Sequence, residues 1–510
     1  MARESLPRSA AGEHNPWLIG VVISIATFMQ VLDTTIVNVA LRNIAGSLAA
    51  SYDESTWILT SYLISNAVIL PVSGWLATVL GRKRFYMGCI AVFTAASVAC
   101  AAATSLSWMV IARLVQGAGG GGMAPVEQAM FADTFPVQQR AQAFALYGLT
   151  VIAAPAIGPV LGGWITDNLS WHWVFLINLP VGLVSLFLVQ SLVAEPKALE
   201  DERRQVLSGG LRIDYVGFAL VALGFGCLQV VLDRFDVDDG FSSSFIVWLS
   251  LIAAAALVAL VVWELLTAEP VVNLRLFAQS RAFAICCGLM FLVGLLLIST
   301  TQLLPQLTEE LMGHSAYESG LTLGIGALAM LVMMPVAGVI TGRVIQPKWL
   351  IAAALIGSGW GIWRSSGLDL QASLWDVSTA RMLQVLWLPF LFIPITSLSY
   401  FGVPPKENNQ ASTLINLMRN IGGSFGISAV QTLLSWRTQF HHARLASAVT
   451  PYNGYGFGHS LAAIAQVVQK QAEVMSYLDI FWLLGLIALC IWPLALLLPR
   501  MPKDAAAPMH

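Results

Sequence analysis

The stretch WLIGVVISIATFMQVLDTTIVNVA (residues 17–40) decides the structural class of this chain. A helix of about 20 apolar residues, rising about 1.5 Å per residue, is long enough to cross the hydrocarbon core of a bilayer. The stretch meets that length, and Asp33 is its only ionisable residue. A helix that is apolar on every side requires lipid or protein around it. We therefore expect residues 17–40 to cross a membrane.

Stretches of this kind recur along the whole chain. Of its 510 residues, 57% are hydrophobic and 11% are charged, and the mean hydropathy is +0.75. A soluble domain carries about 25% charged residues, so the surface here is predicted to face lipid. We expect an all-α polytopic membrane protein with fourteen transmembrane helices. After residues 17–40, the predicted spans are 55–77, 85–103, 107–131, 141–164, 172–193, 214–232, 244–266, 282–305, 319–341, 349–365, 379–400, 411–435 and 478–498.

The composition argues against several functions. A net charge of -2 gives no reason to expect nucleic acid binding. The six cysteines lie in apolar stretches and the seven histidines at or beyond the span ends, so we expect no metal site and no catalytic set at membrane depth. We therefore expect no enzyme and no bound cofactor. The lipid bilayer is an expected partner.

Basic residues indicate the orientation of the chain. An even number of spans places both termini on one side of the membrane. If that side is the cytoplasm, 17 of the 26 Lys and Arg residues lie in inner segments and 7, with Arg381 among them at the outer end of its span, lie in outer segments. Inner segments of membrane proteins carry the excess of positive charge. We therefore expect a multi-pass protein of the bacterial inner membrane with both termini in the cytoplasm.

Two long connections interrupt the short loops between spans. Residues 194–213 are charged, are expected on the cytoplasmic side and follow the sixth span, which indicates a boundary between a six-helix half and the remainder of the chain. Residues 436–477 are expected to form a long outer loop, and loops of that length are commonly functional or disordered.

Ionisable residues inside spans are costly in lipid, so each one is a functional hypothesis. Asp33 is expected about 7 Å to the outer side of the midpoint of its helix, and Arg113 about 9 Å to the outer side of its own. Because the depths agree, we predict that Asp33 and Arg113 form a pair that faces one polar cavity. Separation of the pair would switch Asp33 between charged and protonated forms, as proton coupling requires. The alternative is a static structural pair.

Further polar residues accompany this pair. Gln116 lies one turn from Arg113 on the same helix face, and Asn38 lies in the first span. Either residue is a substrate contact or an interhelical hydrogen-bond residue. Glu127 is about four turns from Arg113 and near the inner boundary. It is either a second proton or cation site, or a carboxylate that reaches the cytoplasmic interface.

The second half of the chain offers Arg419 as a counterpart of Arg113, with Asn416 one turn earlier. We regard both as candidate substrate-binding residues. The neighbouring glycines, and those of residues 117–122, are explained by close helix packing. No lysine followed by serine or threonine comes after residues 117–122, so they do not form a phosphate-binding loop.

The fifth span contains APAIGPVLGG (residues 154–163). Its prolines remove backbone donors and its glycines remove side chains, which predicts a bent helix with a face that packs closely. Such a helix suits a hinge or seal between two moving halves, and ordinary close packing is the alternative. The residues concerned are Pro155, Gly158, Pro159, Gly162 and Gly163.

Four motifs together resemble one known family. They comprise LDTTIVNVAL (32–41), RLVQGAG (113–119), APAIGPVLGG (154–163) and WHWVFLINLPVG (171–182). Over essentially its full length, the chain resembles the major facilitator superfamily, and within it the fourteen-helix drug/proton antiporters of the EmrB/QacA type. The resemblance implies two six-helix bundles, in residues 1–193 and 282–510, with two helices inserted in residues 194–281.

The resemblance also implies a function. Members of the family exchange cytoplasmic or membrane-dissolved amphiphiles for external protons by a rocking motion. The segments VLDRFDVDDGFSS (231–243) and FHHARLASAVTPYN (440–453) are more similar to the EmrB branch. That branch works with a periplasmic adaptor and an outer-membrane channel, so residues 436–477 become a candidate docking surface. A dedicated exporter of one metabolite or fatty acid is the alternative, and a membrane receptor would leave Asp33 without a role.

One motif departs from the superfamily pattern. The segment GWLATVLGRKR (74–84) has Thr78 where an aspartate is usual, so the charge relay that latches the inner side lacks that acid. The segment keeps four residues to which the resemblance assigns a conformational role, namely Gly74, Gly81, Arg82 and Lys83.

Overall fold

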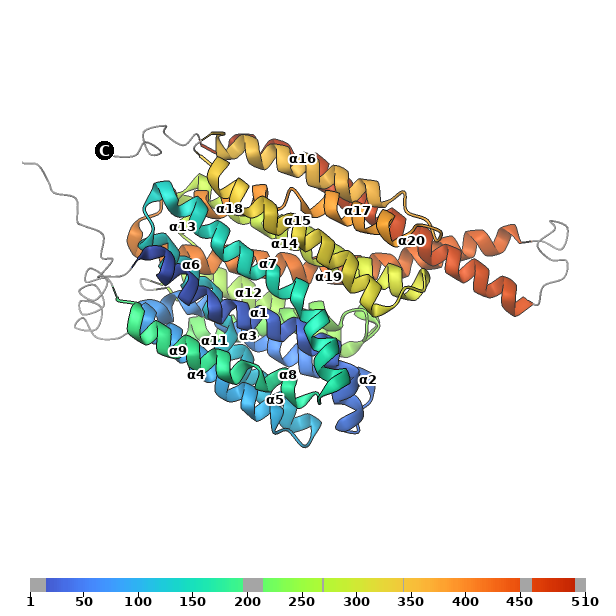
Figure 1. Cartoon of the computed structure of the whole chain (residues 1–510), viewed down its shortest axis with the longest axis horizontal. Coiled ribbons are helices and arrows are strands. Elements are labelled where there is room, and N and C mark those ends of the chain that lie inside the picture. The colour runs from blue at the N-terminus through green and yellow to red at the C-terminus, as the bar shows by residue number, and fades with distance from the viewer. Residues whose placement is uncertain (1–14, 196–213, 268–269, 343, 450–460, 500–510) are drawn as a thin grey trace, which may run out of the picture.

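The computed structural model describes residues 15–195, 214–267, 270–342, 344–449 and 461–499 (Figure 1). Within these ranges the regular structure is helical, apart from an isolated bridge between Thr341 and Ile345. The predicted all-α class is therefore confirmed. Most of the expected linker, residues 196–213, lies outside the described residues.

The N-terminal helices coincide with the first six predicted spans. The fourth span is divided at Gly122, because a run of glycines precedes it and Pro125 lacks the amide hydrogen that would continue the helical bonding. The helices, together with the short α2 (Tyr52–Ser55), are α1 (Pro16–Ser47), α3 (Trp57–Leu80), α4 (Arg82–Ala101), α5 (Leu106–Gly121), α6 (Met123–Thr134), α7 (Val137–Asn168), α8 (His172–Leu176) and α9 (Asn178–Leu192).

The remaining predicted spans also coincide with helices. These are α11 (Tyr215–Arg234), α12 (Ser244–Leu266), α14 (Arg281–Gln306), α15 (Ala316–Ile340), α16 (Pro347–Ser365), α17 (Leu374–Val385) with α18 (Pro389–Ser399), α19 (Asn408–Ala448) and α20 (Leu461–Ile491). The short elements are α13 (Leu276–Gln279), η1 (Gly240–Ser242), η2 (Leu307–Leu311), η3 (Pro405–Glu407) and η5 (Trp492–Leu497).

The same pattern of helix contacts occurs twice. Among the N-terminal helices, α1 packs on α7 and α9, α5 packs on α3 and α4, and α4 packs on α9. Among the C-terminal helices, α14 packs on α19 and α20, α17 packs on α15 and α16, and α16 packs on α20. Helices α11 and α12 pack on each other, and α11 also contacts α3 and α19. By this pattern α17 corresponds to α5, and α14 corresponds to α1.

The chain is a polytopic membrane protein. In the described residues, 11 helical segments are long and apolar enough to cross a membrane. Of the other three predicted spans, one coincides with α5 and α6 and is interrupted between them, one coincides with the short α16, and one coincides with the more polar α19. α12 is the most apolar of the 11 and has one of the smallest buried shares, as expected of a helix that faces lipid. The count of fourteen spans stays a prediction.

Residues 436–477 are not the expected loop. α19 continues to Ala448 and α20 begins at Leu461, and Figure 1 shows the two helices projecting together beyond the rest of the molecule. Alanine, leucine and glutamine favour helix here, while the charged side chains keep the segment too polar to resemble a span. Asp479 accepts hydrogen bonds of 2.7 Å from Arg437 and His441, which join the two helices at the base of the projection. Residues 450–460 lie outside the described residues.

Candidate functional site

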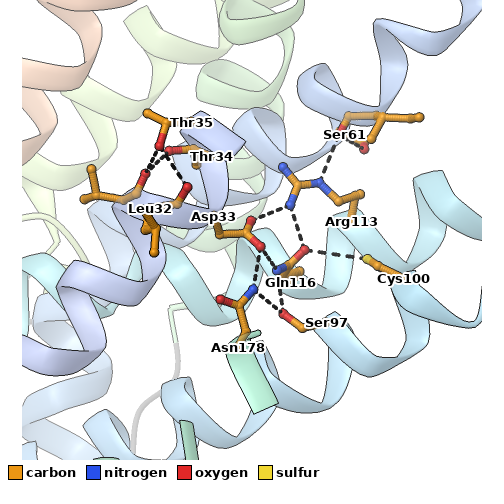
Figure 2. A network of polar contacts seen from close by, with 12 residues as sticks. Leu32, Asp33, Thr34, Thr35, Ser61, Ser97, Cys100, Arg113, Gln116 and Asn178 are labelled. Carbon is orange, nitrogen blue, oxygen red and sulfur yellow. Dashed lines mark hydrogen bonds and ion pairs between the residues drawn. The ribbon is translucent and has the colours of Figure 1, made fainter. Parts of the chain in front are cut away.

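The predicted contact between Asp33 and Arg113 is present. α5 packs on α3 and α4, and the Arg113 side chain reaches across to α1, where its Nη1 lies 2.7 Å from Asp33 Oδ2 (Figure 2). Their exposed fractions are 0% for Arg113 and 1% for Asp33. Both side chains are enclosed by protein in this conformation, and the polar cavity that we expected beside the pair stays a prediction. The role of the pair in proton coupling stays a prediction as well.

Three amide and guanidinium donors converge on the Asp33 carboxylate (Figure 2). Gln116 Nε2 donates to Oδ1 at 3.0 Å, and Asn178 Nδ2 donates to the same oxygen at 2.6 Å. Arg113 in turn donates to the Gln116 side-chain oxygen at 2.7 Å. An ionised carboxylate accepts hydrogen bonds only, and every contact here has that sense. The site is therefore arranged for a charged Asp33 that is matched by Arg113.

Sequence reasoning missed two members of this network. Asn178 begins α9, and Ser97 lies on α4. The Ser97 hydroxyl accepts hydrogen bonds from Gln116 at 2.7 Å and from Asn178 at 3.1 Å. The signal for Asn178 was an amide inside the apolar motif WHWVFLINLPVG. Ser97 gave no such signal, because serine is common in membrane helices.

Glu127 does not reach the interface. Its exposed fraction is 0%, and Ser24 on α1 donates a hydrogen bond of 2.7 Å to Oε1. Among the described residues, Oε2 has no hydrogen-bond partner. The interpretation of Glu127 as a carboxylate at the cytoplasmic interface is therefore wrong, because it is enclosed by protein. Its role as a second proton site stays a prediction.

The predicted substrate residues are divided among separate places. Gln116 belongs to the Asp33 network, whereas Asn38 is exposed on α1. Asn416 and Gln128 join α19 to α6 through a hydrogen bond of 2.9 Å between Asn416 Nδ2 and Gln128 Oε1. The guanidinium carbon of Arg419 lies 6.0 Å from the centre of the Phe392 ring. Asn416 and Arg419 lie one turn apart on α19, and in the described residues no hydrogen bond joins either of them to Gln116 or Asn38.

The N-terminal and C-terminal helices meet near the beginning of α1, which we call the Pro16 end. At Gly74 on α3 an added Cβ would lie 2.8 Å from the Thr413 hydroxyl and 3.0 Å from the Asn409 carbonyl. The Thr78 hydroxyl accepts a hydrogen bond of 3.0 Å from Asn409 Nδ2. The residue that replaces the usual aspartate therefore still links α3 to α19.

A second link at the Pro16 end is ionic. Arg82 pairs with Asp133, and Asp133 accepts a hydrogen bond of 2.8 Å from Asn408 on α19. Gly81 begins this turn with φ of 89°, a backbone conformation that favours glycine. Lys83 donates to the Gln190 carbonyl at 2.8 Å. Arg82, Asp133 and Asn408 thus link α4, α6 and α19 without an acid at position 78, and a role of Gly74, Gly81, Arg82 and Lys83 in conformational change stays a prediction.

Two glycines of residues 154–163 pack against α1. A Cβ at Gly158 would collide with Thr35, and one at Gly162 would lie 3.2 Å from Ile36. Gly163 has nothing within 4 Å of its would-be Cβ. α7 is continuous through Pro155, and the side chain of Pro159 lies outside the described residues. Close packing thus accounts for Gly158 and Gly162, and the hinge stays a prediction.

Residues 23–427 match the Major Facilitator Superfamily. The chain belongs to this family. The motif-based resemblance is thereby confirmed, and since the family consists of transporters, the expectation that the chain is not an enzyme is confirmed as well. The fold agrees: a proton:xylose symporter, XylE, bound to 6-bromo-6-deoxy-D-glucose has a TM-score of 0.60 at 14% identity, over 96% of this chain and 97% of that one.

Relatives place this superfamily member in the EmrB-like branch. The multidrug export protein EmrB of Escherichia coli (strain K12) is 35% identical over 91% of this chain and 92% of its own. EmrB of Haemophilus influenzae is 33% identical over 93% and 94%. The fatty acid resistance protein FarB of Neisseria gonorrhoeae is 30% identical over 90% and 91%.

Proposed function

We propose that this protein exports hydrophobic and amphipathic compounds, including drugs, from the cytoplasm or inner leaflet in exchange for protons. It crosses the bacterial inner membrane fourteen times, with both termini in the cytoplasm and two six-helix bundles around the inserted α11 and α12. The export of drugs is supported by relatives named as multidrug export proteins. The proton as coupling ion is supported by one observation, the buried pair of Asp33 and Arg113.

The pair offers a mechanism for coupling. Asp33 is held charged by Arg113, Gln116 and Asn178 while the site is dry. When outside water reaches it, a proton neutralises Asp33 and removes the attraction for Arg113. The freed guanidinium and the lost link between α1 and α5 then favour the other orientation of the halves. Proton release to the cytoplasm restores the pair, so one proton moves inward for each return.

The contacts at the Pro16 end fit one step of this cycle. With both termini in the cytoplasm, the Pro16 end faces the cytoplasm, and α3 and α6 contact α19 there. The conformation is then closed toward the cytoplasm. Opening to the cytoplasm requires separation of Thr78 from Asn409 and of Asp133 from Asn408.

Substrate-driven proton release by the reconstituted protein tests the proposal. Dyes, biocides and fatty acids are added to proteoliposomes at fixed pH, and proton release is recorded with a pH indicator. Asp33→Asn should abolish release without affecting insertion. Asp369→Asn is the matched control, since Asp369 is exposed in a connection and carries the same change. Normal release by Asp33→Asn contradicts the coupling role.

The range of active compounds decides between two export functions. Release by many unrelated compounds supports a multidrug exporter. Release by fatty acids alone supports a dedicated exporter, the alternative favoured by the similarity to FarB.

We also propose that the projecting ends of α19 and α20 bind a periplasmic adaptor, which connects to an outer-membrane channel. The exposed Phe440 and Val467 give these ends an apolar surface. Serine at both positions should prevent co-purification of the adaptor while proteoliposome transport continues. Unchanged co-purification contradicts this docking site.

A further inference from the structure

The arginine motif of α5 occurs a second time in α17. α5 contains RLVQ at residues 113–116, and α17 contains RMLQ at residues 381–384. In each helix the arginine is the eighth residue, and a serine caps the helix start. Since α17 corresponds to α5 in the repeated contact pattern, Arg381 is the positional counterpart of Arg113. This role had been expected for Arg419, and Arg381 had been counted among the outer charges.

Arg381 lies inside the protein. Its exposed fraction is 5%. Nη1 donates to the Thr300 hydroxyl at 3.1 Å and Nη2 donates to the Thr301 hydroxyl at 2.6 Å. Both threonines belong to α14, the counterpart of α1. Where α1 provides the carboxylate of Asp33, α14 provides two neutral hydroxyls.

The charge of Arg381 has no counterion in the part of the chain that the structure describes. No carboxylate there forms an ion pair with it, and its Nε has no hydrogen-bond partner. The Thr300 and Thr301 hydroxyls already donate to the Leu296 and Leu297 carbonyls, so they only accept from the guanidinium. A buried charge without a partner costs several kcal/mol.

The acids on the helices around Arg381 are either exposed or engaged elsewhere. Glu309 and Glu310 lie in η2, which continues α14, and both are exposed. α14 and α16 contain no Asp or Glu. Glu318 on α15 and Asp376 on α17 each accept the capping hydrogen bonds of Ser315 and Ser373 at the start of their own helices. Within the described helices around Arg381, no carboxylate therefore serves as its counterion.

We propose that Arg381, with Thr300 and Thr301, binds the carboxylate of an anionic amphiphilic cargo. A planar guanidinium binds a carboxylate through two parallel hydrogen bonds, and the open Nε lies on one such edge. The acyl chain of the cargo would lie along the apolar helices of the C-terminal half. This inference deepens the proposed function and rests on it, because it assigns a charge class to part of the cargo.

A pair of ligands with equal chains and opposite charges tests the site. Laurate and dodecyltrimethylammonium both carry a twelve-carbon chain, and titration calorimetry on the full-length protein in a phosphate-free detergent gives Kd for each. Arg381→Gln should lower the affinity for laurate relative to the cation at least about tenfold, since hydrogen bonds to charged groups are the strong ones. Arg381→Lys should lower it less, because it keeps the charge without the planar fork.

The control is Arg364→Gln, the same substitution at an exposed position at the end of α16. It should leave the affinity ratio unchanged. A ratio that also stays unchanged in Arg381→Gln overturns the inference. If the affinity ratio stays unchanged while Arg381→Gln loses tightly bound phospholipid, measured as phosphorus, the bound anion is a lipid phosphate and the inference is overturned as well. If the wild-type protein binds the cation but not laurate, the inference is overturned and the proposed function stands. If it binds neither ligand, the proposed export of amphiphiles is contradicted as well.

Discussion

Asn409 of α19 donates a hydrogen bond of 3.0 Å to Thr78 of α3, and this bond joins the N-terminal to the C-terminal helices at the Pro16 end. The Thr78 hydroxyl is neutral, so its hydrogen bond with Asn409 is weaker than the bond that an aspartate carboxylate at position 78 would accept from the start of α19. The closed state at this end is therefore held by hydrogen bonding and by the close approach of Gly74 to α19.

Loss of this bond should open the Pro16 end. Thr78→Val keeps the shape of the side chain and removes the acceptor, so Asn409 loses its partner and the closed conformation is destabilised by about 1 kcal/mol. Spin labels at Leu80 and Lys406, both exposed, report the separation of α3 from the start of α19. In a background without native cysteines, Thr78→Val should increase the population with the longer distance.

Thr78→Ser keeps the hydroxyl and is the control for that measurement. It should reproduce the wild-type distance distribution. A distribution that Thr78→Val leaves unchanged would show that other contacts alone close this end.

The ion pair of Arg82 with Asp133 should dominate the stability of the same region. Arg82 is 4% exposed and Asp133 is 17% exposed, so the pair is largely desolvated. Asp133→Asn removes the carboxylate that pairs with the buried guanidinium, which should destabilise the fold by about 3 kcal/mol. Thermal unfolding in detergent measures the loss.

A double mutant separates the pair from its surroundings. Arg82→Gln together with Asp133→Asn removes both charges, and it should be more stable than Asp133→Asn alone. Strictly additive losses from the two substitutions would mean that the two charges do not interact.

The contact of α7 with α1 gives a third prediction. An alanine at Gly158 would force Thr35 away from its position, and overpacking of this kind costs about 1–3 kcal/mol. Gly158→Ala should therefore lower the midpoint of thermal unfolding. Thr35→Ala in the same chain should restore most of it, because it removes the colliding atoms.

Gly163→Ala is the matched control, since nothing lies within 4 Å of the added atom. It should leave the midpoint unchanged or raise it. Equal changes of the unfolding midpoint in Gly158→Ala and Gly163→Ala would show that Gly158 is needed for backbone conformational freedom and not for packing.

The sequence was sufficient to predict the contact between Asp33 and Arg113, because membrane helices have a fixed rise and a fixed thickness to cross. Depth along each helix then follows from residue number. The rotation of a helix about its axis does not follow in the same way. Asn178 was therefore missed, because its contact with Asp33 depends on how α9 faces α1.

The place of Arg381 could not be predicted from hydropathy. The apolar stretch begins at residue 379, but α17 begins at Leu374, where Ser373 and Asp376 cap the helix. Because the capping residues are polar, hydropathy does not detect the first turns of α17. Arg381 was therefore assigned to an outer segment. Hydropathy also does not detect the polar helical segments within residues 436–477, where α19 and α20 extend beyond their apolar spans.

Asn178 itself gives the last prediction. Its amide donates to Asp33 at 2.6 Å, and a hydrogen bond to a charged group contributes about 1.5–3 kcal/mol. Asn178→Ala should therefore leave the charged carboxylate poorly held and slow cargo-driven proton release about tenfold. Asn168→Ala, at an exposed position on α7, is the control and should keep the wild-type rate. If Asn178→Ala releases protons at the wild-type rate while remaining folded, Asn178 serves packing alone, and Arg113 with Gln116 suffices to hold Asp33.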